Sequence, residues 1–175
     1  MIYVIIGPSG SGKTTLGDYF RSLGMNELVS HTTRKMRPGE VDGISYHFVT
    51  EEEFSLIDKI EESVYSGSRY GVSRKEVEEK LRSGDVFAVT DINGAKAFRR
   101  IFGDLVSVIF ISSSARRLRE RMRERGDSKE SIRARISTLM DKNEYRNRYF
   151  ADHVIENNVS VSTFLRQGRR LIGKL

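Results

Sequence analysis

The sequence predicts a single α/β domain in which a parallel β-sheet is flanked by helices. Short apolar segments at 2–6, 85–91 and 106–111 alternate with helical segments such as 94–102 and 115–125, a pattern typical of parallel strands joined by helical crossovers. A glycine-rich stretch also follows the first apolar segment directly, as it would at the carboxyl edge of such a sheet. At 175 residues the chain is long enough for one domain with a substantial core.

The composition indicates a globular protein rather than a disordered or membrane-spanning one. Hydrophobic residues make up 38% of the chain and charged residues 31%, and no apolar run reaches the roughly 18 residues that a membrane span requires. No positive charge precedes Gly7, so we expect no signal peptide. The absence of cysteine excludes disulfides, thiolate metal sites and a cysteine nucleophile. These features predict a cytoplasmic protein with no membrane partner.

The first strand and the loop after it are the most informative part of the chain. Residues 3–6 are apolar on both faces, as expected of a central parallel strand. Residues 7–14, GPSGSGKT, match the P-loop pattern G-x-x-x-x-G-K-[ST], and 15–23 continue as a helix. Glycines let successive N–H groups of such a loop turn inward around a phosphate chain. A glycine-rich turn without a ligand is the alternative, but the complete motif favours a bound nucleoside triphosphate.

Each position of this loop has an expected role. Lys13 should reach the β- and γ-phosphates, and the Thr14 hydroxyl should contribute to a Mg²⁺ site. The positive end of the following helix lies at the same point. The expected ATP-binding residues of the loop are Gly7, Pro8, Ser9, Gly10, Ser11, Gly12, Lys13, Thr14 and Thr15.

A second phosphate site is predicted at residues 30–48. Pro38 forbids a regular helix here, so the segment is expected to be a structured loop with a short strand. Arg34 and Arg37 are three residues apart and can converge on one dianion, because the guanidinium group matches the geometry of phosphate oxygens. Taken alone, a basic loop facing water is an equal alternative. Next to a P-loop, the second phosphate site is favoured.

The other elements follow from the same patterns. Further strands are expected at 45–49 and 153–156. Further helices are expected at 51–58, 73–83, 94–102, 115–125, 128–148 and 160–174. In the segment 115–139 apolar residues recur at helical spacing. The arginines between them are expected to face water, namely Arg117, Arg119, Arg121 and Arg123.

The segment 30–48 also carries a family pattern. It reads SHTTRKMRPGEVDGISYHF and matches S-x-T-T-R-x-x-R-x-G-E-x-x-G-x-x-Y-x-F at every fixed position. The chain therefore resembles the guanylate kinases, in which this pattern is the GMP-binding signature. The resemblance implies a P-loop NTPase fold with a core at about 1–29, 85–114 and 140–175, an NMP-binding insertion at about 30–84 and a helical lid at about 115–139. It implies GMP contacts from Ser30, Arg34, Arg37, Glu40, Tyr46, Glu62, Tyr70, Val72 and Asp91.

The resemblance also assigns residues on the ATP side. Arg125 and Arg135 stand where the family has arginines that contact the γ-phosphate from the lid, and Asn157 is similar to the family's adenine-contacting asparagine. The catalytic set that this implies is Lys13, Arg34, Arg125 and Arg135. The expected residues of the Mg²⁺ site are Thr14 and Asp91.

Two positions depart from the family pattern. The family's Y-G-[ST]-S reads Tyr70-Gly71-Val72-Ser73 here, so Val72 places a methyl group where a hydroxyl is expected at guanine O6. In the family's D-I-D-x-Q-G-A the first aspartate is replaced by Val89 and the second is kept as Asp91. Both changes concern the base and the metal, so the phosphate chemistry is better supported than the choice of base.

The expected reaction is Mg²⁺-assisted transfer of the ATP γ-phosphoryl group to GMP or dGMP, giving ADP and GDP in purine nucleotide metabolism. A kinase of another acceptor, such as a ribose bisphosphate or another nucleoside monophosphate, is favoured by Val72 and opposed by Glu40 and Glu62. A non-catalytic guanylate-kinase-like module is opposed by the intact P-loop. The net charge of +6 admits nucleic acid, but without a recognisable binding motif we expect no nucleic-acid partner, and a monomer or homodimer.

Overall fold

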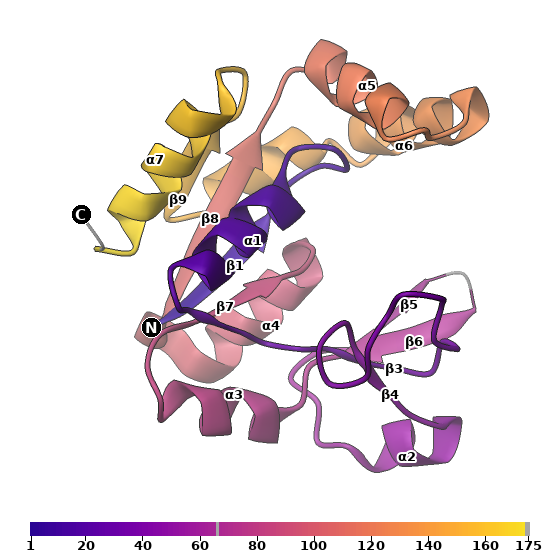
Figure 1. Ribbon diagram of the computed structural model, residues 1–175, viewed down its shortest axis with the longest axis vertical. Coiled ribbons are helices and arrows are strands. Elements are labelled where there is room, and N and C mark those ends of the chain that lie inside the picture. The colour runs from indigo at the N-terminus through magenta and orange to yellow at the C-terminus, as the bar shows by residue number, and fades with distance from the viewer. Residues whose placement is uncertain (66, 174–175) are drawn as a thin grey trace.

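The main sheet has five parallel strands and positions the P-loop at its carboxyl edge. The computed structural model describes residues 1–65 and 67–173 (Figure 1). The strand order is β2-β7-β1-β8-β9, with the first apolar segment in the centre. These strands are β1 (Ile2–Ile6), β2 (Asn26–Glu27), β7 (Val86–Val89), β8 (Val106–Ser112) and β9 (His153–Glu156).

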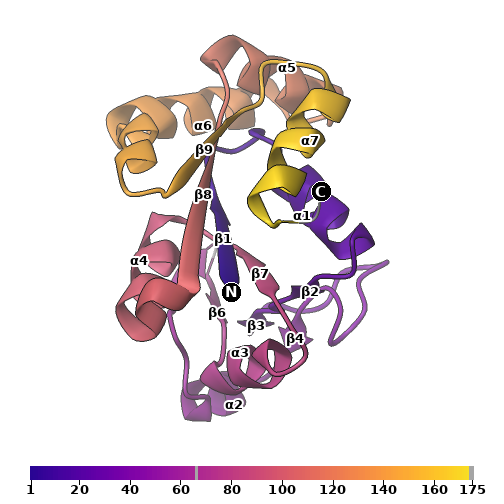
Figure 2. The ribbon, with the colours of Figure 1, turned by 90° about the vertical axis from the view of Figure 1, so that its left-hand side faces the viewer.

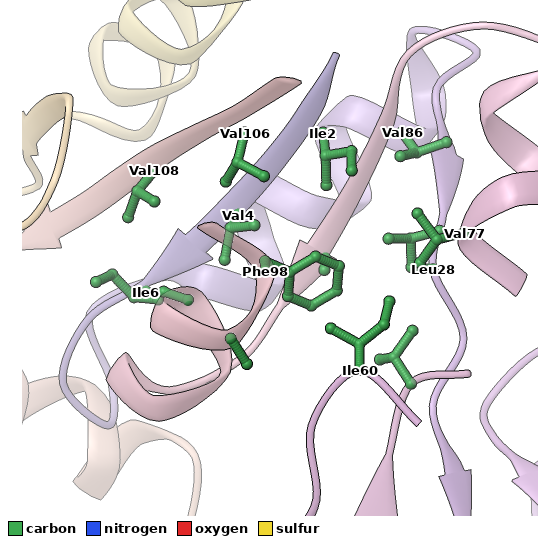
Figure 3. Close-up of a cluster of buried hydrophobic side chains, with 14 of the residues drawn as sticks. Ile2, Val4, Ile6, Leu28, Ile60, Val77, Val86, Phe98, Val106 and Val108 are labelled. Atoms are coloured by element: carbon green, nitrogen blue, oxygen red, sulfur yellow. The ribbon is translucent and has the colours of Figure 1, made fainter. Parts of the chain in front are cut away.

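Both faces of this sheet are covered, which explains why β1 is apolar throughout. Ile2, Val4 and Ile6 pack on one face, against α4 and α3 (Figure 3). Tyr3 and Ile5 pack on the other face, against α1 and α7. Figure 2 shows α1 and α7 on one side of the sheet and α4 on the other. Fully burying one such side chain contributes about 1.5–3 kcal/mol, so β1 anchors both halves of the core.

Most helices begin where a polar side chain caps the first turn. The capping residues of α2 to α7 accept a hydrogen bond from a backbone N–H group of that turn, and they are Thr50, Ser73, Asp91, Ser114, Ser128 and Ser160. The α-helices are α1 (Lys13–Ser22), α2 (Glu51–Leu56), α3 (Arg74–Leu81), α4 (Ile92–Phe102), α5 (Ala115–Glu124), α6 (Lys129–Asp141) and α7 (Val161–Leu171). Two 3₁₀ helices are η1 (Gly103–Leu105) and η2 (Glu144–Tyr149). No helix in the described ranges is both long enough and apolar enough to cross a membrane.

A second, smaller sheet holds the segment that carries the family pattern. Its strand order is β4-β3-β6-β5, and Figure 1 shows it apart from the main sheet. Its strands are β3 (His31–Thr32), β4 (His47–Phe48), β5 (Ser63–Tyr65) and β6 (Ser68–Gly71). Only β4 was expected from the sequence, within 45–49.

The predicted fold class is confirmed, with one correction to the helices. The expected helix over 128–148 is wrong, because α6 ends at Asp141 and Asn143 adopts a left-handed conformation with φ of 48°. Asparagine tolerates that conformation better than most residues do. The chain then turns into η2, which returns it towards β9. The expected end of the last helix, at 174, lies outside the described residues.

Candidate active site

The loop between β1 and α1 has the backbone that a phosphate-binding loop requires. Gly7, Gly10 and Gly12 have φ values of 148°, 80° and 107°, which side chains with a Cβ rarely adopt. A Cβ at Gly7 would lie 2.6 Å from the Ile111 carbonyl oxygen, and one at Gly12 would lie 2.6 Å from Asn157 Nδ2. In the described chain no side chain caps α1, so the N–H groups of its first turn are available to an anion.

Lys13 lies inside this loop. Its Nζ donates to the carbonyl oxygens of Gly7 at 2.7 Å and Pro8 at 3.1 Å. Burial lowers the pKa of Lys13 to about 8, against the opposing effect of the Glu144 carboxylate and with a further contribution from two nearby arginines. A buried ammonium held by carbonyl groups alone is stabilised when an anion arrives.

Arg125 and Arg135 are the two arginines that act on Lys13. Arg135 donates from Nη1 to Ser9 Oγ at 2.7 Å, and Ser9 belongs to the P-loop. Arg125 forms a bidentate pair with Asp127, at 2.9 and 2.5 Å. The Arg135 guanidinium is 3.9 Å from the same carboxylate. The structure therefore brings together three of the four residues predicted to be catalytic.

Asn157 and Arg121 hold the P-loop backbone in place through its carbonyl oxygens. Asn157 is buried, and its Nδ2 donates to the Ser11 carbonyl oxygen at 2.8 Å. Arg121 donates from Nη2 to Asn157 Oδ1 at 3.0 Å and to the Asn157 carbonyl oxygen at 2.7 Å, and from Nη1 to Ser113 Oγ at 3.0 Å. The prediction that Arg121 faces water is therefore wrong. Both amide atoms of Asn157 are bonded within the protein, so the geometry supports a bracing role rather than the predicted adenine contact.

The predicted phosphate-acceptor residues form one cluster on the second sheet. Arg34 forms a bidentate pair with Glu40, at 3.0 and 2.6 Å, and lies 5.3 Å from the centre of the Tyr46 ring. The Tyr46 and Tyr70 rings are 5.8 Å apart. Glu40 also accepts from the Arg37 N–H group at 2.8 Å, and the guanidinium of Arg34 holds the pKa of Glu40 below its usual value. These five residues are called the acceptor cluster below.

Two adjacent glutamates have different surroundings, and the sequence did not distinguish them. Glu62 is exposed and accepts from Arg69 Nε at 2.7 Å and Nη2 at 3.0 Å. Glu61 is partly buried, and this burial, with the negative charge of Asp91 next in effect, raises its pKa to about 7. Of the two glutamates, it is Glu61 whose pKa is raised by the charge of Asp91. Only the tertiary structure reveals this, because both residues have the same side chain.

Two cavities that share one lining residue lie beside the P-loop, and one of them reaches Tyr46 of the acceptor cluster. The larger, of about 560 Å³, has Lys13, Asp91, Arg135 and Glu144 in its lining. The smaller, of about 210 Å³, is lined by residues that include Thr14 from the P-loop end of α1 and Ser30 and Tyr46 from the acceptor side. Val89 lines both cavities.

The residues predicted to hold Mg²⁺ line different cavities, which share Val89. Asp91 caps α4 and accepts from the N–H groups of Asn93 and Gly94 at 2.9 and 3.0 Å. Thr14 lines the smaller cavity and Asp91 the larger. Thr14 and Thr15 are both exposed at the start of α1. Among the described residues no group of three or more histidine, cysteine or acidic side chains could hold a metal ion. A donor set of one hydroxyl and one carboxylate suits Mg²⁺, which is bound largely through substrate phosphates and water.

Position 72 lies in the core. Val72 is 2% exposed and belongs to the same buried cluster as Leu28 and Ile60. Ser73 caps α3, with its Oγ accepting from the Glu76 N–H group at 3.1 Å. The hydroxyl group next to Val72 is thus already engaged in the fold.

Comparison with known proteins agrees with this geometry. The family model described as guanylate kinase matches residues 1–171. The chain belongs to the guanylate kinase family. It is 37% identical over 164 residues to the guanylate kinase of Fusobacterium nucleatum, covering 90% of this chain and 88% of that protein. It is 38% identical over 170 residues to the guanylate kinase of Mannheimia succiniciproducens, covering 90% and 80%.

The solved structures include a guanylate kinase of similar fold. The crystal structure of guanylate kinase from Anaplasma phagocytophilum has a TM-score of 0.72 and 27% identity, and the match covers 99% of this chain and 84% of that one. The resemblance to guanylate kinases, the prediction of an enzyme and the prediction of a P-loop NTPase fold are confirmed.

Proposed function

We propose that the chain transfers the γ-phosphoryl group of ATP, bound at the P-loop, to the phosphate of GMP, bound at the acceptor cluster. Family membership establishes the reaction, the ATP-dependent phosphorylation of GMP; the assignment of residues is our proposal. One observation carries it: the cavity lined by Lys13 shares Val89 with the cavity lined by Ser30 and by Tyr46 of the acceptor cluster.

Three cations act on the transferring group. Phosphoryl transfer needs positioning and charge neutralisation more than a covalent intermediate, and the site supplies both. Lys13 turns from the loop carbonyls to the phosphate chain, and Arg135 already touches the P-loop through Ser9. Arg125 exchanges its exposed pair with Asp127 for phosphate oxygens. Lys13 and Arg125 thus leave their present partners on ATP binding, whereas Arg135 is already at the P-loop.

The acceptor cluster holds the GMP phosphate. Arg34 is oriented by Glu40 and by the face of Tyr46, so its planar fork is fixed before the ligand arrives. Arg37 brings a second guanidinium to the same loop, and the phenols of Tyr46 and Tyr70 add donors. Ser30 lines the smaller cavity beside Tyr46. This set positions the acceptor oxygen for transfer.

We assign recognition of the guanine base to Glu61. A carboxylate can accept from guanine N1–H and from the N2 amino group. Glu61 is partly buried and has no ion-pair partner among the described residues, whereas Glu62 is exposed and paired with Arg69. The raised pKa of Glu61 means that some of it is protonated near neutral pH. The donors of guanine favour the ionised form and would lower that pKa again.

Thr14 and Asp91 would hold Mg²⁺, whose charge offsets that of the β- and γ-phosphates when it is bound. We further assign residues 30–84 as the NMP-binding insertion and 115–139 as the lid, with the rest as the core. Closure of these two parts over the nucleotides would exclude water, which otherwise competes with GMP for the phosphoryl group.

The variant Arg34→Ala tests this assignment, with Lys35→Ala as its control. Lys35 is the next residue and is exposed, so the control removes one positive charge from the same loop. We expect Arg34→Ala to raise the KM for GMP by roughly tenfold or more, as loss of a charged hydrogen-bonding group does, with the KM for ATP unchanged. Steady-state kinetics with each substrate varied would show this. An increased KM for ATP alone, or equal effects of both variants on GMP, would contradict the proposal.

A further inference from the structure

The positive charge of the chain is concentrated in the α5–α6 hairpin. Residues 115–136 contain nine lysine and arginine residues and four acidic residues, a net charge of +5 within a chain of +6. In both ribbon views the two helices lie side by side at one end of the molecule (Figures 1 and 2). The known reaction uses only part of this charge.

The cations divide between two faces of the hairpin. Arg121, Arg125 and Arg135 belong to the face directed at the P-loop. At 100° per residue, Arg123 on α5 and Arg133 on α6 lie about half a turn away from these residues. The buried side chains between the two faces join the helices, and they are Leu118, Met122, Ile132, Ile136 and Leu139. The outer face therefore carries charge that the proposed mechanism does not use.

A groove of about 500 Å³ lies on this outer face. Its lining consists of four cations and two isoleucines, namely Arg119, Arg123, Lys129, Ile132, Arg133 and Ile136. The isoleucines are 5% and 8% exposed and form an apolar floor. The groove has no carboxylate in its lining.

The acidic residues of the hairpin are absent from the lining of the groove. Glu120 pairs with Arg116 and Arg117, and Asp127 pairs with Arg125. Glu124 lies about 100° around α5 from Arg123. Glu130 is three residues before Arg133 and is its neighbour on the surface of α6, but neither glutamate belongs to the lining of the groove. Within the described ranges, no ion pair joins a carboxylate to any of the four groove cations. Four like charges that converge in a concave site repel one another and attract a polyanion.

We propose that this groove binds a nucleoside triphosphate at a site separate from the P-loop. Its volume is that of a small-molecule site, and its four cations match the charge of a triphosphate. The isoleucine floor offers apolar surface to the sugar and base. The lining contains no aromatic side chain, whereas sites for single-stranded nucleic acid typically stack bases on aromatic rings.

Calorimetric titration with CTP tests the proposal. ADP and GMP are included at concentrations just sufficient to fill the two nucleotide sites of the family reaction, because a large excess of ADP would compete with CTP for the groove. The groove variant is Arg123→Gln with Arg133→Gln, and the control is Arg82→Gln with Arg100→Gln, two exposed arginines near the ends of α3 and α4. We expect one CTP site in the wild type, weakened at least about tenfold in the groove variant and unchanged in the control. Inorganic tripolyphosphate should bind at the same groove but more weakly, and added salt should weaken both.

Three results would overturn the proposal. The first is no binding of CTP by the wild type at millimolar concentration. The second is equal binding by the wild type and the groove variant, which would place CTP at the P-loop or the acceptor cluster. The third is tight binding of a 20-nucleotide RNA without binding of CTP, which would make the groove a nucleic-acid surface. If the groove variant melts at a lower temperature than the wild type, Arg119→Gln with Lys129→Gln replaces it.

Discussion

Replacing Lys13 by methionine should abolish most of the kinase activity. At neutral pH it should also raise the free energy of unfolding of the ligand-free chain, because it removes a buried charge. Lys13 is enclosed by the P-loop, and its ammonium is held by two carbonyl oxygens. Lys13→Met keeps much of the side-chain volume and removes the charge. We expect kcat to fall by at least about a hundredfold, because a charge aimed at the transferring phosphate is lost, while the KM for GMP stays nearly the same.

The stability effect follows from the lowered pKa of Lys13. Folding lowers this pKa from 10.5 to about 8, so the folded state opposes protonation. Below pH 8 the full penalty applies, roughly 3 kcal/mol at 1.36 kcal/mol for each pKa unit. As pH rises from 8 to 10.5 the folded chain releases this proton while the unfolded chain still holds it, so the penalty falls and is lost above pH 10.5. The free energy of unfolding of the wild type should therefore rise by about 2.5 kcal/mol relative to that of Lys13→Met between pH 7 and pH 10.

Urea unfolding of both proteins at pH 7, 8, 9 and 10 measures this gain. Other lysines and tyrosines titrate in both proteins, so they cancel in the difference between the two free energies of unfolding. The exposed Lys35 gives the control, because Lys35→Met removes an ammonium that stays in water and should show no such trend. A difference between wild type and Lys13→Met that stays constant from pH 7 to pH 10 would refute the reasoning.

Two further substitutions test the base side of the site. Glu61→Gln should raise the KM for GMP by about tenfold or more, because an NH₂ donor then replaces one of the two carboxylate oxygens that accept from guanine. Glu62→Gln should change this KM less than twofold. The reverse order would show that Glu62 is the residue that binds the base. Val72→Thr should lower the free energy of unfolding by about 1–3 kcal/mol, since it places a hydroxyl in the core. A KM for GMP that falls fivefold or more in Val72→Thr would instead show that position 72 reaches guanine O6, as the family pattern predicts.

The features that the sequence predicts well are encoded in contiguous segments. The P-loop and the pattern at 30–48 each lie on one short stretch, so fixed spacing alone identifies them. Strands β1, β7 and β8 were predictable because each is a continuous apolar run buried in the sheet, whereas β2, which has only two polar residues, was not expected. Family and fold class follow from these segments.

The features that the sequence does not predict depend on contacts between distant segments. The strands of the second sheet are two to four residues long, which is too short for an alternation of apolar and polar residues to be recognised. Arg121 resembles its neighbours on α5 but reaches Asn157, 36 residues away. Glu61 and Glu62 are identical in type, and only Arg69 and Asp91 distinguish them.

The most direct test of the central claim is an acceptor panel with ATP and Mg²⁺, in which ADP release is followed with GMP, dGMP, AMP, CMP and UMP. A site that hydrogen-bonds a base rejects analogues that leave its polar groups unpaired. We therefore expect kcat/KM for GMP and dGMP to exceed that for the other three by at least about a hundredfold. Equal turnover of GMP and AMP would contradict the assignment of a guanine site, whatever the outcome at the P-loop.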